Sequence, residues 1–280
     1  MLTRLISGIV LLAGLIIVVA LGGPVLLLFT LLISLIGFFE LVRASGVRNE
    51  KEAFALPEAV GYVGILAYYG VVFFGKEAFE AYGLMVIILT IMGMLLFYVL
   101  TFPRYKASQI MAAGFSFLYA PVLLSFIYQT RALPMGKYLV WLIFCASWGC
   151  DTCAYVVGML FGKHKLAPVL SPKKSIEGAV GGVAGAALIS FVYAKGLTMF
   201  ATDLTLGSGI LWTFPCISAV GSVLSQCGDL AASGIKRDHE LKDYSHLIPG
   251  HGGIMDRFDS VIVTAPMIYY LVILLTGCLK

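Results

Sequence analysis

Charged residues are scarce in this sequence. Asp, Glu, Lys and Arg make up 12% of its 280 residues, whereas hydrophobic residues make up 60% and the mean hydropathy is +0.97. A soluble globular domain is only roughly 45–50% apolar, and a soluble fold of this length would have to bury nearly everything. The composition therefore excludes a soluble fold and favours an all-α integral membrane protein.

Paired metal-binding cysteines are also missing. The six cysteines, at positions 145, 150, 153, 216, 227 and 278, lie almost all in apolar runs, where cysteine usually packs as a small hydrophobe. Cys150 and Cys153 have CxxC spacing, but a zinc site would need a second pair. We interpret this motif as packing and expect no disulfide framework.

Duplicated halves are absent as well. Transporters often contain repeats with interrupted helices, whereas here the polar residues gather after position 145 and no inverted repeat pairs the two halves. Ion-coupled transport, with Asp151 and Asp229 as coupling sites, is therefore only an alternative hypothesis.

Nine apolar runs are long enough to cross a bilayer as helices, which takes about 20 residues each. Gly22-Gly23-Pro24 separates the first two runs, and an equally apolar run follows the first, so we expect a helix there rather than a cleaved signal peptide. The expected helices are Leu5–Leu21, Val25–Val42, Ala59–Gly75, Leu84–Phe102, Ile110–Tyr128, Tyr138–Phe161, Ala179–Lys195, Ile210–Ala232 and Ser260–Leu279. We group them into N-terminal helices (1–83), middle helices with a possible dimerisation region (84–162) and a catalytic region (163–280).

The basic residues predict the orientation. Of the 19 lysines and arginines, 14 fall at the N-terminus or in the loops after the second, fourth, sixth and eighth helices. The positive-inside rule places these loops in the cytoplasm, with the N-terminus on the same side and the C-terminus outside. The five on the other side are Lys76, Arg131, Lys137, Lys195 and Lys280.

One stretch, Ser233–Asp259, interrupts the apolar pattern with a high density of charged residues and three of the four histidines. Ionisable groups gathered at a membrane face usually serve a polar ligand or an ion. Asp229, just upstream, has no cation among its neighbours, so a metal or a lysine from the next loop must neutralise it. Asp229 and Asp256 come from different helices and are the oxygen ligands that Mg²⁺ prefers.

Other acidic residues have interpretations that do not require a functional site. Asp151 lies in the sixth apolar run, where a buried ion pair with Lys163 or Lys165 is the alternative to a functional role. We interpret Asp259 as a helix N-terminal charge and Glu240 as a solvated loop acid.

A second polar cluster is Ser171–Gly178. Pro172 favours an extended chain, Lys173 and Lys174 follow, Ser175 can cap the next helix, and Glu177 lies in its first turn. A helix N-terminus beside lysines and hydroxyls suits phosphate, although a basic loop that only touches anionic lipid is an alternative.

Glycines mark two further places. Gly178, Gly181, Gly182 and Gly185 form overlapping GxxxG steps, which predict close helix packing. Residues 250–253, Gly-His-Gly-Gly, form either a backbone nest for phosphate or a simple tight turn.

Together these residues indicate phosphate chemistry at the cytoplasmic face. Carboxylates for Mg²⁺ and cations for phosphate oxygens are present, and phosphoryl or nucleotidyl transfer needs mainly positioning and charge neutralisation. A site in the membrane indicates that one substrate is a lipid.

The residues that carry a family resemblance are Ser233-Gly-Ile-Lys-Arg-Asp, Lys242-Asp243 and Leu247-Ile-Pro-Gly-His-Gly-Gly-Ile-Met-Asp-Arg-Phe-Asp259. This pattern resembles the signature of the phosphatidate cytidylyltransferases, also called CDP-diacylglycerol synthases. Asp151, Ala154-Tyr155, Gly158, Phe161-Gly162-Lys163 and Ser171–Gly178 match the family too. The motif resemblance covers about residues 148–260, and the first half is similar only as a set of apolar helices.

The resemblance implies a nucleotidyltransferase of phospholipid biosynthesis that converts CTP and phosphatidic acid to CDP-diacylglycerol and pyrophosphate. It also implies a homodimeric enzyme of the cytoplasmic (inner) membrane, with a Mg²⁺-dependent site that faces the cytoplasm, a second cation as a possibility, and no nucleic-acid partner. Our mechanistic hypothesis is in-line attack by a phosphatidic acid oxygen on the α-phosphorus of CTP. A polyprenol or phytol kinase is the alternative enzyme.

The resemblance also implies roles for individual residues. Asp229 and Asp256 would hold the metal and, with Lys236 and Arg237, form the catalytic set. The residues implied to bind substrate are Ser171, Lys173, Lys174, Ser175, Glu177, Lys242, Asp243, His251, Arg257 and Asp151. Ser175 stands where the family pattern has threonine, and Cys150 and Cys227 are unusual neighbours of the key carboxylates.

Overall fold

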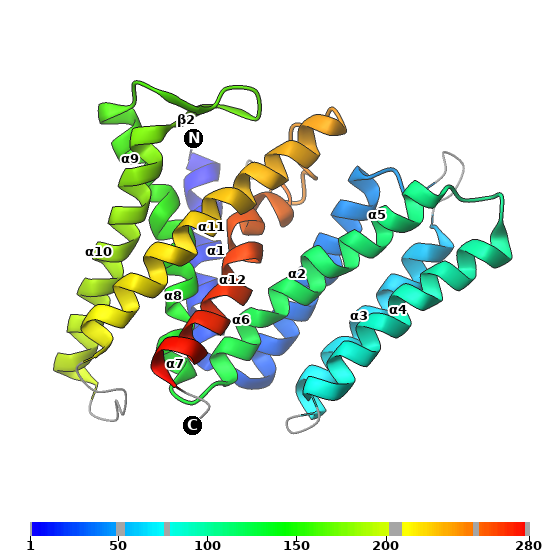
Figure 1. The fold of residues 1–280 in the computed structure, drawn as a ribbon, viewed down its shortest axis with the longest axis horizontal. Helices are drawn as coiled ribbons and strands as arrows, with labels where there is room; N and C mark the ends of the chain where they lie inside the picture. Colours follow the sequence, from blue (N-terminus) through cyan, green and yellow to red (C-terminus); the bar gives the residue numbers. More distant parts are fainter. Residues whose placement is uncertain (1, 49–53, 76–78, 202–208, 249–251, 278–280) are drawn as a thin grey trace. The chain divides into compact units, whose positions relative to one another are not determined.

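The computed structural model describes residues 2–48, 54–75, 79–201, 209–248 and 252–277 (Figure 1). Almost all of its regular structure is helical. The elements are α1 (Leu2–Leu21), α2 (Gly23–Ala44), α3 (Leu56–Phe74), α4 (Phe79–Thr101), α5 (Ala107–Phe117), the π-helical turn η1 (Leu118–Val122), α6 (Leu123–Ala132), α7 (Gly136–Leu139), α8 (Trp141–Phe144), the π-helical turn η2 (Cys145–Gly149), α9 (Cys150–Phe161), β1 (Lys165–Ala167), β2 (Ser171–Ser175), α10 (Ile176–Phe200), α11 (Ile210–Asp238) and α12 (Met255–Thr276).

The predicted class, an all-α integral membrane protein, is confirmed. Within the described residues, eight helices are long and apolar enough to cross a membrane, and a shorter apolar helix, Val10–Leu21, precedes them. Two of the eight spans are composite: Ala107–Ala132 runs through α5, η1 and α6, and Gly136–Phe161 runs from α7 to α9. The count of about nine is therefore approximately met.

The break between α1 and α2 lies where the glycines and proline predict it. Gly22 precedes α2 with a φ of 64°, and Pro24 stands in the first turn of the helix. A positive φ is accessible to glycine without strain, and proline is tolerated where no helical N–H bond is required. The short Gly-Gly-Pro sequence therefore ends one helix and starts the next.

The chain divides into two compact units. Unit 1 contains Met1–Tyr128 and His239–Arg257, and unit 2 contains Gln129–Asp238 and Phe258–Lys280. Each unit thus combines residues that are distant in the sequence. The three segments predicted from the sequence, 1–83, 84–162 and 163–280, stay a prediction.

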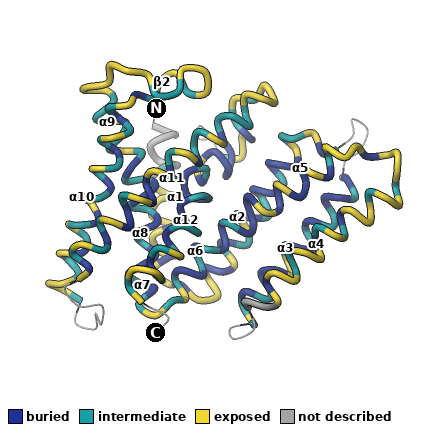
Figure 2. Tube along the Cα trace, viewed as in Figure 1, coloured by how far each residue is buried: buried dark blue, intermediate teal, exposed yellow. Residues whose placement is uncertain are grey.

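Unit 1 has an aromatic core between α2, α3 and α5 that includes fully buried Phe38, Tyr69 and Phe117. The Tyr69 hydroxyl lies 2.7 Å from the Ser34 hydroxyl, so the polar end of this ring is satisfied inside the core. In contrast, α4 presents large exposed apolar side chains such as Leu96 and Val99, and Figure 2 draws much of it as intermediate or exposed. Such a surface suits contact with lipid.

An ion pair ties the end of α2 to the start of α3 in unit 1. The buried Glu58 carboxylate accepts two hydrogen bonds from Arg48, at 2.7 and 2.8 Å. This contact raises the pKa of the Arg48 guanidinium above its ordinary value. The pair is bidentate, which is the strong geometry for an arginine and a carboxylate.

Unit 2 contains a close contact between α9 and α10, as the GxxxG steps predict. A methyl group added at Gly182 would lie 2.9 Å from Cys150 Sγ and from Ala154 Cβ, and one added at Gly181 or Gly185 would overlap Val157 or Cys153. Small residues let helix backbones approach in this way. Cys150 and Cys153 are free thiols within this contact, so the interpretation of the CxxC motif as packing is confirmed.

Candidate functional site

The polar part of unit 2 begins with a β-hairpin between α9 and α10. β1 and β2 pair antiparallel, with Lys165 opposite Ser175 and Ala167 opposite Ser171. The sequence predicted an extended chain at Pro172 but no strands. Ser175 is the N-cap of α10 and its hydroxyl accepts a hydrogen bond from the Gly178 N–H at 3.1 Å, so the predicted cap is confirmed.

Glu177 anchors the hairpin from the first turn of α10. Its carboxylate accepts hydrogen bonds from the backbone N–H groups of Lys163 and His164, at 3.1 and 3.2 Å, and lies 2.6 Å from His164 Nδ1. These contacts fix the start of the hairpin relative to α10. They give Glu177 partners within the chain, and its predicted role toward substrate stays a prediction.

Lys174 on β2 forms an ion pair with Asp229 on α11. The sequence required a metal or a lysine from the following loop to neutralise Asp229, and the structure supplies a lysine from the preceding hairpin instead. Both side chains are 26% exposed, so the pair is screened from bulk water but accessible to a ligand.

Two further carboxylates, from two other helices, lie around this ion pair. Asp151 on α9 and Asp259 on α12 both interact electrostatically with Asp229, and Ser260 lies beside Asp151. Asp259, interpreted from the sequence as only a helix N-terminal charge, therefore belongs to the cluster. The Ser225 hydroxyl, one turn before Asp229 on α11, is buried without a hydrogen-bond partner among the described residues.

The cluster fits a divalent cation. Among the described residues, three carboxylates outnumber Lys174 and Lys236, the cations that interact with them, and negative charge in a membrane helix needs compensation. The described residues contain no group of three His, Cys, Asp or Glu side chains able to hold a metal by themselves. Mg²⁺ is usually bound by one or two carboxylates together with substrate phosphates and water, so a complete site would need ligands beyond these side chains.

The remaining predicted residues of unit 2 lie on the hairpin and on α11. Ser171 and Lys173 are on β2, and Lys236 and Arg237 are in the last turn of α11. α11 has 29 residues, so at 1.5 Å per residue it is about 44 Å long and exceeds the roughly 30 Å hydrocarbon core. Lys236 and Arg237, at its end, therefore need not lie within the apolar layer.

Asp256, in unit 1, closes the loop that precedes α12. Its carboxylate accepts hydrogen bonds from the backbone N–H groups of Tyr244, at 2.8 Å, and Gly253, at 2.9 Å. Gly252 has a φ of 82°, and a Cβ there would lie 2.8 Å from the Asp256 carboxylate. Tyr244 and Gly253, from two parts of the loop, thus both donate to Asp256. His251, which is predicted to face phosphate, lies outside the described residues.

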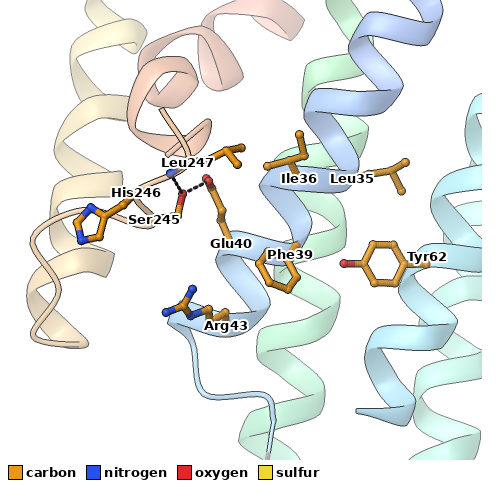
Figure 3. A pocket seen from close by; sticks show the side chains of 9 residues that line it. All are labelled: Leu35, Ile36, Phe39, Glu40, Arg43, Tyr62, Ser245, His246 and Leu247. Atoms are coloured by element: carbon orange, nitrogen blue, oxygen red, sulfur yellow. Dashed lines mark hydrogen bonds between the residues drawn. The ribbon is translucent and has the colours of Figure 1, made fainter. Parts of the chain in front are cut away.

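Glu40 on α2 is a buried carboxylate that the sequence analysis missed. It is 1% exposed and accepts a hydrogen bond from Ser245 Oγ at 2.5 Å (Figure 3). It also accepts hydrogen bonds from the backbone N–H groups of Ile254, at 3.0 Å, and Met255, at 2.8 Å. The signal was available, because Glu40 is a carboxylate inside the apolar run Val25–Val42. Glu40 therefore holds Ser245 of the α11–α12 loop, which is described at residues 239–248 and 252–254, and the start of α12 within unit 1.

Three other predicted residues are also in unit 1. Lys242 is exposed and Asp243 is half-buried in the α11–α12 loop, and Arg257 is exposed in the first turn of α12. Asp229 and Asp256 belong to different units, so their predicted sharing of one metal stays a prediction.

The model of the Cytidylyltransferase family matches residues 2–275, nearly the whole chain. The chain belongs to the cytidylyltransferase family. Among its relatives, the phosphatidate cytidylyltransferases of Staphylococcus saprophyticus and Staphylococcus epidermidis are each 32% identical over 90% of this chain and 91% of their own. The phosphatidate cytidylyltransferase of Rickettsia felis is 40% identical over 50% of this chain and 60% of its own. Cytidylyltransferases transfer a nucleotidyl group, a reaction that generally uses a divalent metal.

Proposed function

We propose that this membrane enzyme transfers the cytidylyl group of CTP to phosphatidic acid. The observation that supports this most is the cluster of Asp151, Asp229 and Asp259 on three spans of a cytidylyltransferase, with Lys174 of the hairpin paired to Asp229. A phosphate oxygen of phosphatidic acid attacks the α-phosphorus of CTP and forms a new P–O bond. The bond from that phosphorus to the bridging oxygen of the β-phosphate breaks, and pyrophosphate leaves with the electron pair.

Asp229 and Asp256 would hold Mg²⁺, which when bound would neutralise charge on the CTP phosphates. Lys174 then leaves its ion pair with Asp229 and binds a phosphate oxygen. Lys236, Arg237, Lys242, Arg257 and His251 stabilise the departing pyrophosphate. The attacking phosphate is already anionic at neutral pH, so no residue of the chain has to remove a proton from it.

The other residues predicted to contact substrate lie on the hairpin and on other elements. Ser171, Lys173 and Ser175 would bind phosphate oxygens at the N-terminus of α10. Glu177 holds that hairpin in place, and Asp151 and Asp243 would orient bound substrate. A second cation beside Asp259 is compatible with the surplus of carboxylates.

We also propose that the enzyme lies in the cytoplasmic membrane with its site toward the cytoplasm. The basic loops predict that the N-terminus and the site face the cytoplasm, and the staphylococcal relatives favour the cytoplasmic membrane. We also propose that two copies form a homodimer through the middle helices, 84–162.

The test of the function is product analysis. Purified protein is incubated with phosphatidic acid, Mg²⁺ and CTP that carries one label on the cytosine and another on the γ-phosphate. We expect the cytosine label in the lipid and the γ label in pyrophosphate. Appearance of the γ label in the lipid would identify a lipid kinase instead.

Asp229→Asn tests the role of the carboxylate cluster. We expect turnover to fall to background, because Lys174 and the metal both lose their charged partner, while the thermal unfolding temperature changes little. Glu240→Gln, an exposed acid in the α11–α12 loop, is the matched control and should keep wild-type turnover. Near-normal activity of Asp229→Asn would remove Asp229 from the catalytic set.

A further inference from the structure

Two cavities in unit 1 lie against the α11–α12 loop. The larger has a volume of about 570 Å³, within the range of roughly 300–1,000 Å³ that is typical of ligand pockets. The smaller has a volume of about 310 Å³. They share three lining residues, Arg43, Ser245 and His246, so the two cavities adjoin one another.

The larger cavity is apolar and has rigid walls. Leu35, Ile36 and Phe39 line it from α2, and Tyr62 lines it from α3 (Figure 3). The Tyr62 ring is held edge-on by Phe38, with centroids 5.2 Å apart, and is stacked on Phe54 at 5.9 Å. Both helices are membrane spans, so the natural occupant of this cavity is a hydrocarbon chain that is available in the bilayer.

The smaller cavity has a polar character that complements an anion. Arg43, in the last turn of α2, is exposed and makes no hydrogen bond or ion pair through its side chain with the described residues. The exposed His246 imidazole borders the same space. Arginine binds phosphate oxygens in a bidentate fork, so a phosphate at the junction of the cavities would meet a cation whose side chain is not already engaged.

We propose that these two cavities bind the lipid substrate, phosphatidic acid, with acyl chain in the larger cavity and phosphate beside Arg43. The inference rests on the proposed function and adds the location and the determinants of lipid binding. A nucleotide alone would leave the apolar walls uncovered, and a neutral lipid would leave Arg43 unused. A ligand with both an apolar chain and an anionic phosphate satisfies both cavities.

Glu40 connects this lipid site to the α11–α12 loop. It lines the larger cavity and also holds Ser245 and the first residues of α12. The lipid would therefore touch the same loop that carries Lys242 and Asp243, residues implied to bind substrate.

Ile36→Trp tests the apolar cavity by filling it. We expect the KM for long-chain phosphatidic acid in mixed micelles to rise roughly five- to tenfold, while the KM for CTP stays at the wild-type value. Dihexanoyl phosphatidic acid should be used equally well by variant and wild type, because its short chains do not need the filled space. Leu32→Trp is the matched control, since Leu32 is one turn earlier on α2, is exposed, and does not line the cavity.

Arg43→Gln tests the phosphate contact. Loss of a charge-assisted hydrogen bond should raise the KM for phosphatidic acid of either chain length about tenfold, again without effect on the KM for CTP. Lys106→Gln removes an exposed charge of the same unit away from the cavities and should behave as wild type. An equal rise in the KM for CTP in either cavity variant would overturn the proposal.

A binding measurement separates this proposal from the proposed function. Photoactivatable phosphatidic acid, with the reactive group in the acyl chain, should label peptides containing residues 35–39, and Ile36→Trp should lose that label. Labelling at these residues in a protein that forms no CDP-diacylglycerol would support the lipid site and overturn the activity. Equal labelling by phosphatidylglycerol, or retention of the label in Ile36→Trp, would overturn the lipid site even in an active enzyme.

Discussion

At the scale of single residues, the buried carboxylate of Glu40 forms hydrogen bonds with a distant part of the sequence. Its partners, Ser245, Ile254 and Met255, are more than 200 residues away along the chain. Ser245 lies in the α11–α12 loop, and Ile254 and Met255 lie where that loop joins α12. Glu40 holds these residues through hydrogen bonds, so we expect it to act as a positioning residue.

Glu40→Ala should leave two backbone N–H groups buried without acceptors, at a cost of about 1–3 kcal/mol for each group. We expect lower thermal stability and a loss of kcat that exceeds the loss of folded protein, because the loop and the start of α12 are no longer fixed. Glu40→Gln keeps an acceptor oxygen and should restore part of the kcat. The measurements are thermal unfolding in detergent and CDP-diacylglycerol formation per folded molecule.

Glu58→Ala is the control for this experiment. Glu58 is also a fully buried carboxylate of unit 1, but it pairs with Arg48 rather than with the α11–α12 loop. Its removal should destabilise the protein and leave the kcat of the folded fraction unchanged. If both alanine variants lower kcat equally, Glu40 has only a structural role.

At the scale of elements, the hairpin that carries Lys174 depends on the contact between α9 and α10. Gly182→Ala places a methyl group against Cys150 and Ala154, and overpacking of this kind costs typically 1–3 kcal/mol. We expect a lower unfolding temperature and reduced activity. Gly196→Ala, on the same helix but with open space around it, should be neutral or slightly stabilising. Equal unfolding temperatures for the two variants would contradict this account of the helix contact.

The elements also show which features a sequence predicts well. The spans, the Gly22 break, the Ser175 cap and the glycine contact all depend on local patterns of a few residues, and the structure confirms them. The β-hairpin escaped prediction because strands of three and five residues leave no periodic signal.

Pairings across helices were harder to predict than local features. Asp229 was recognised as a charge that needs a partner, but the choice of Lys174 depends on how the hairpin folds back on α11. For the same reason the sequence predicts only a helix N-terminal charge at Asp259 and no role for Glu40, since the partners of both lie on other elements. Sequence position identifies a charge that needs neutralising, and only the fold identifies its partner.

At the scale of the whole molecule, the uneven distribution of basic residues predicts one orientation in the membrane. Lys106 and Lys137 are both exposed and lie at opposite ends of the span Ala107–Ala132, so they report on the two sides. In a variant without the native cysteines, a membrane-impermeant maleimide applied to intact cells should label Lys137→Cys and not Lys106→Cys. After permeabilisation both positions should be labelled, which controls for accessibility. The reverse pattern would place the basic loops outside and would remove CTP binding at Lys236 and Arg237 from the cytoplasm, where the nucleotide is available.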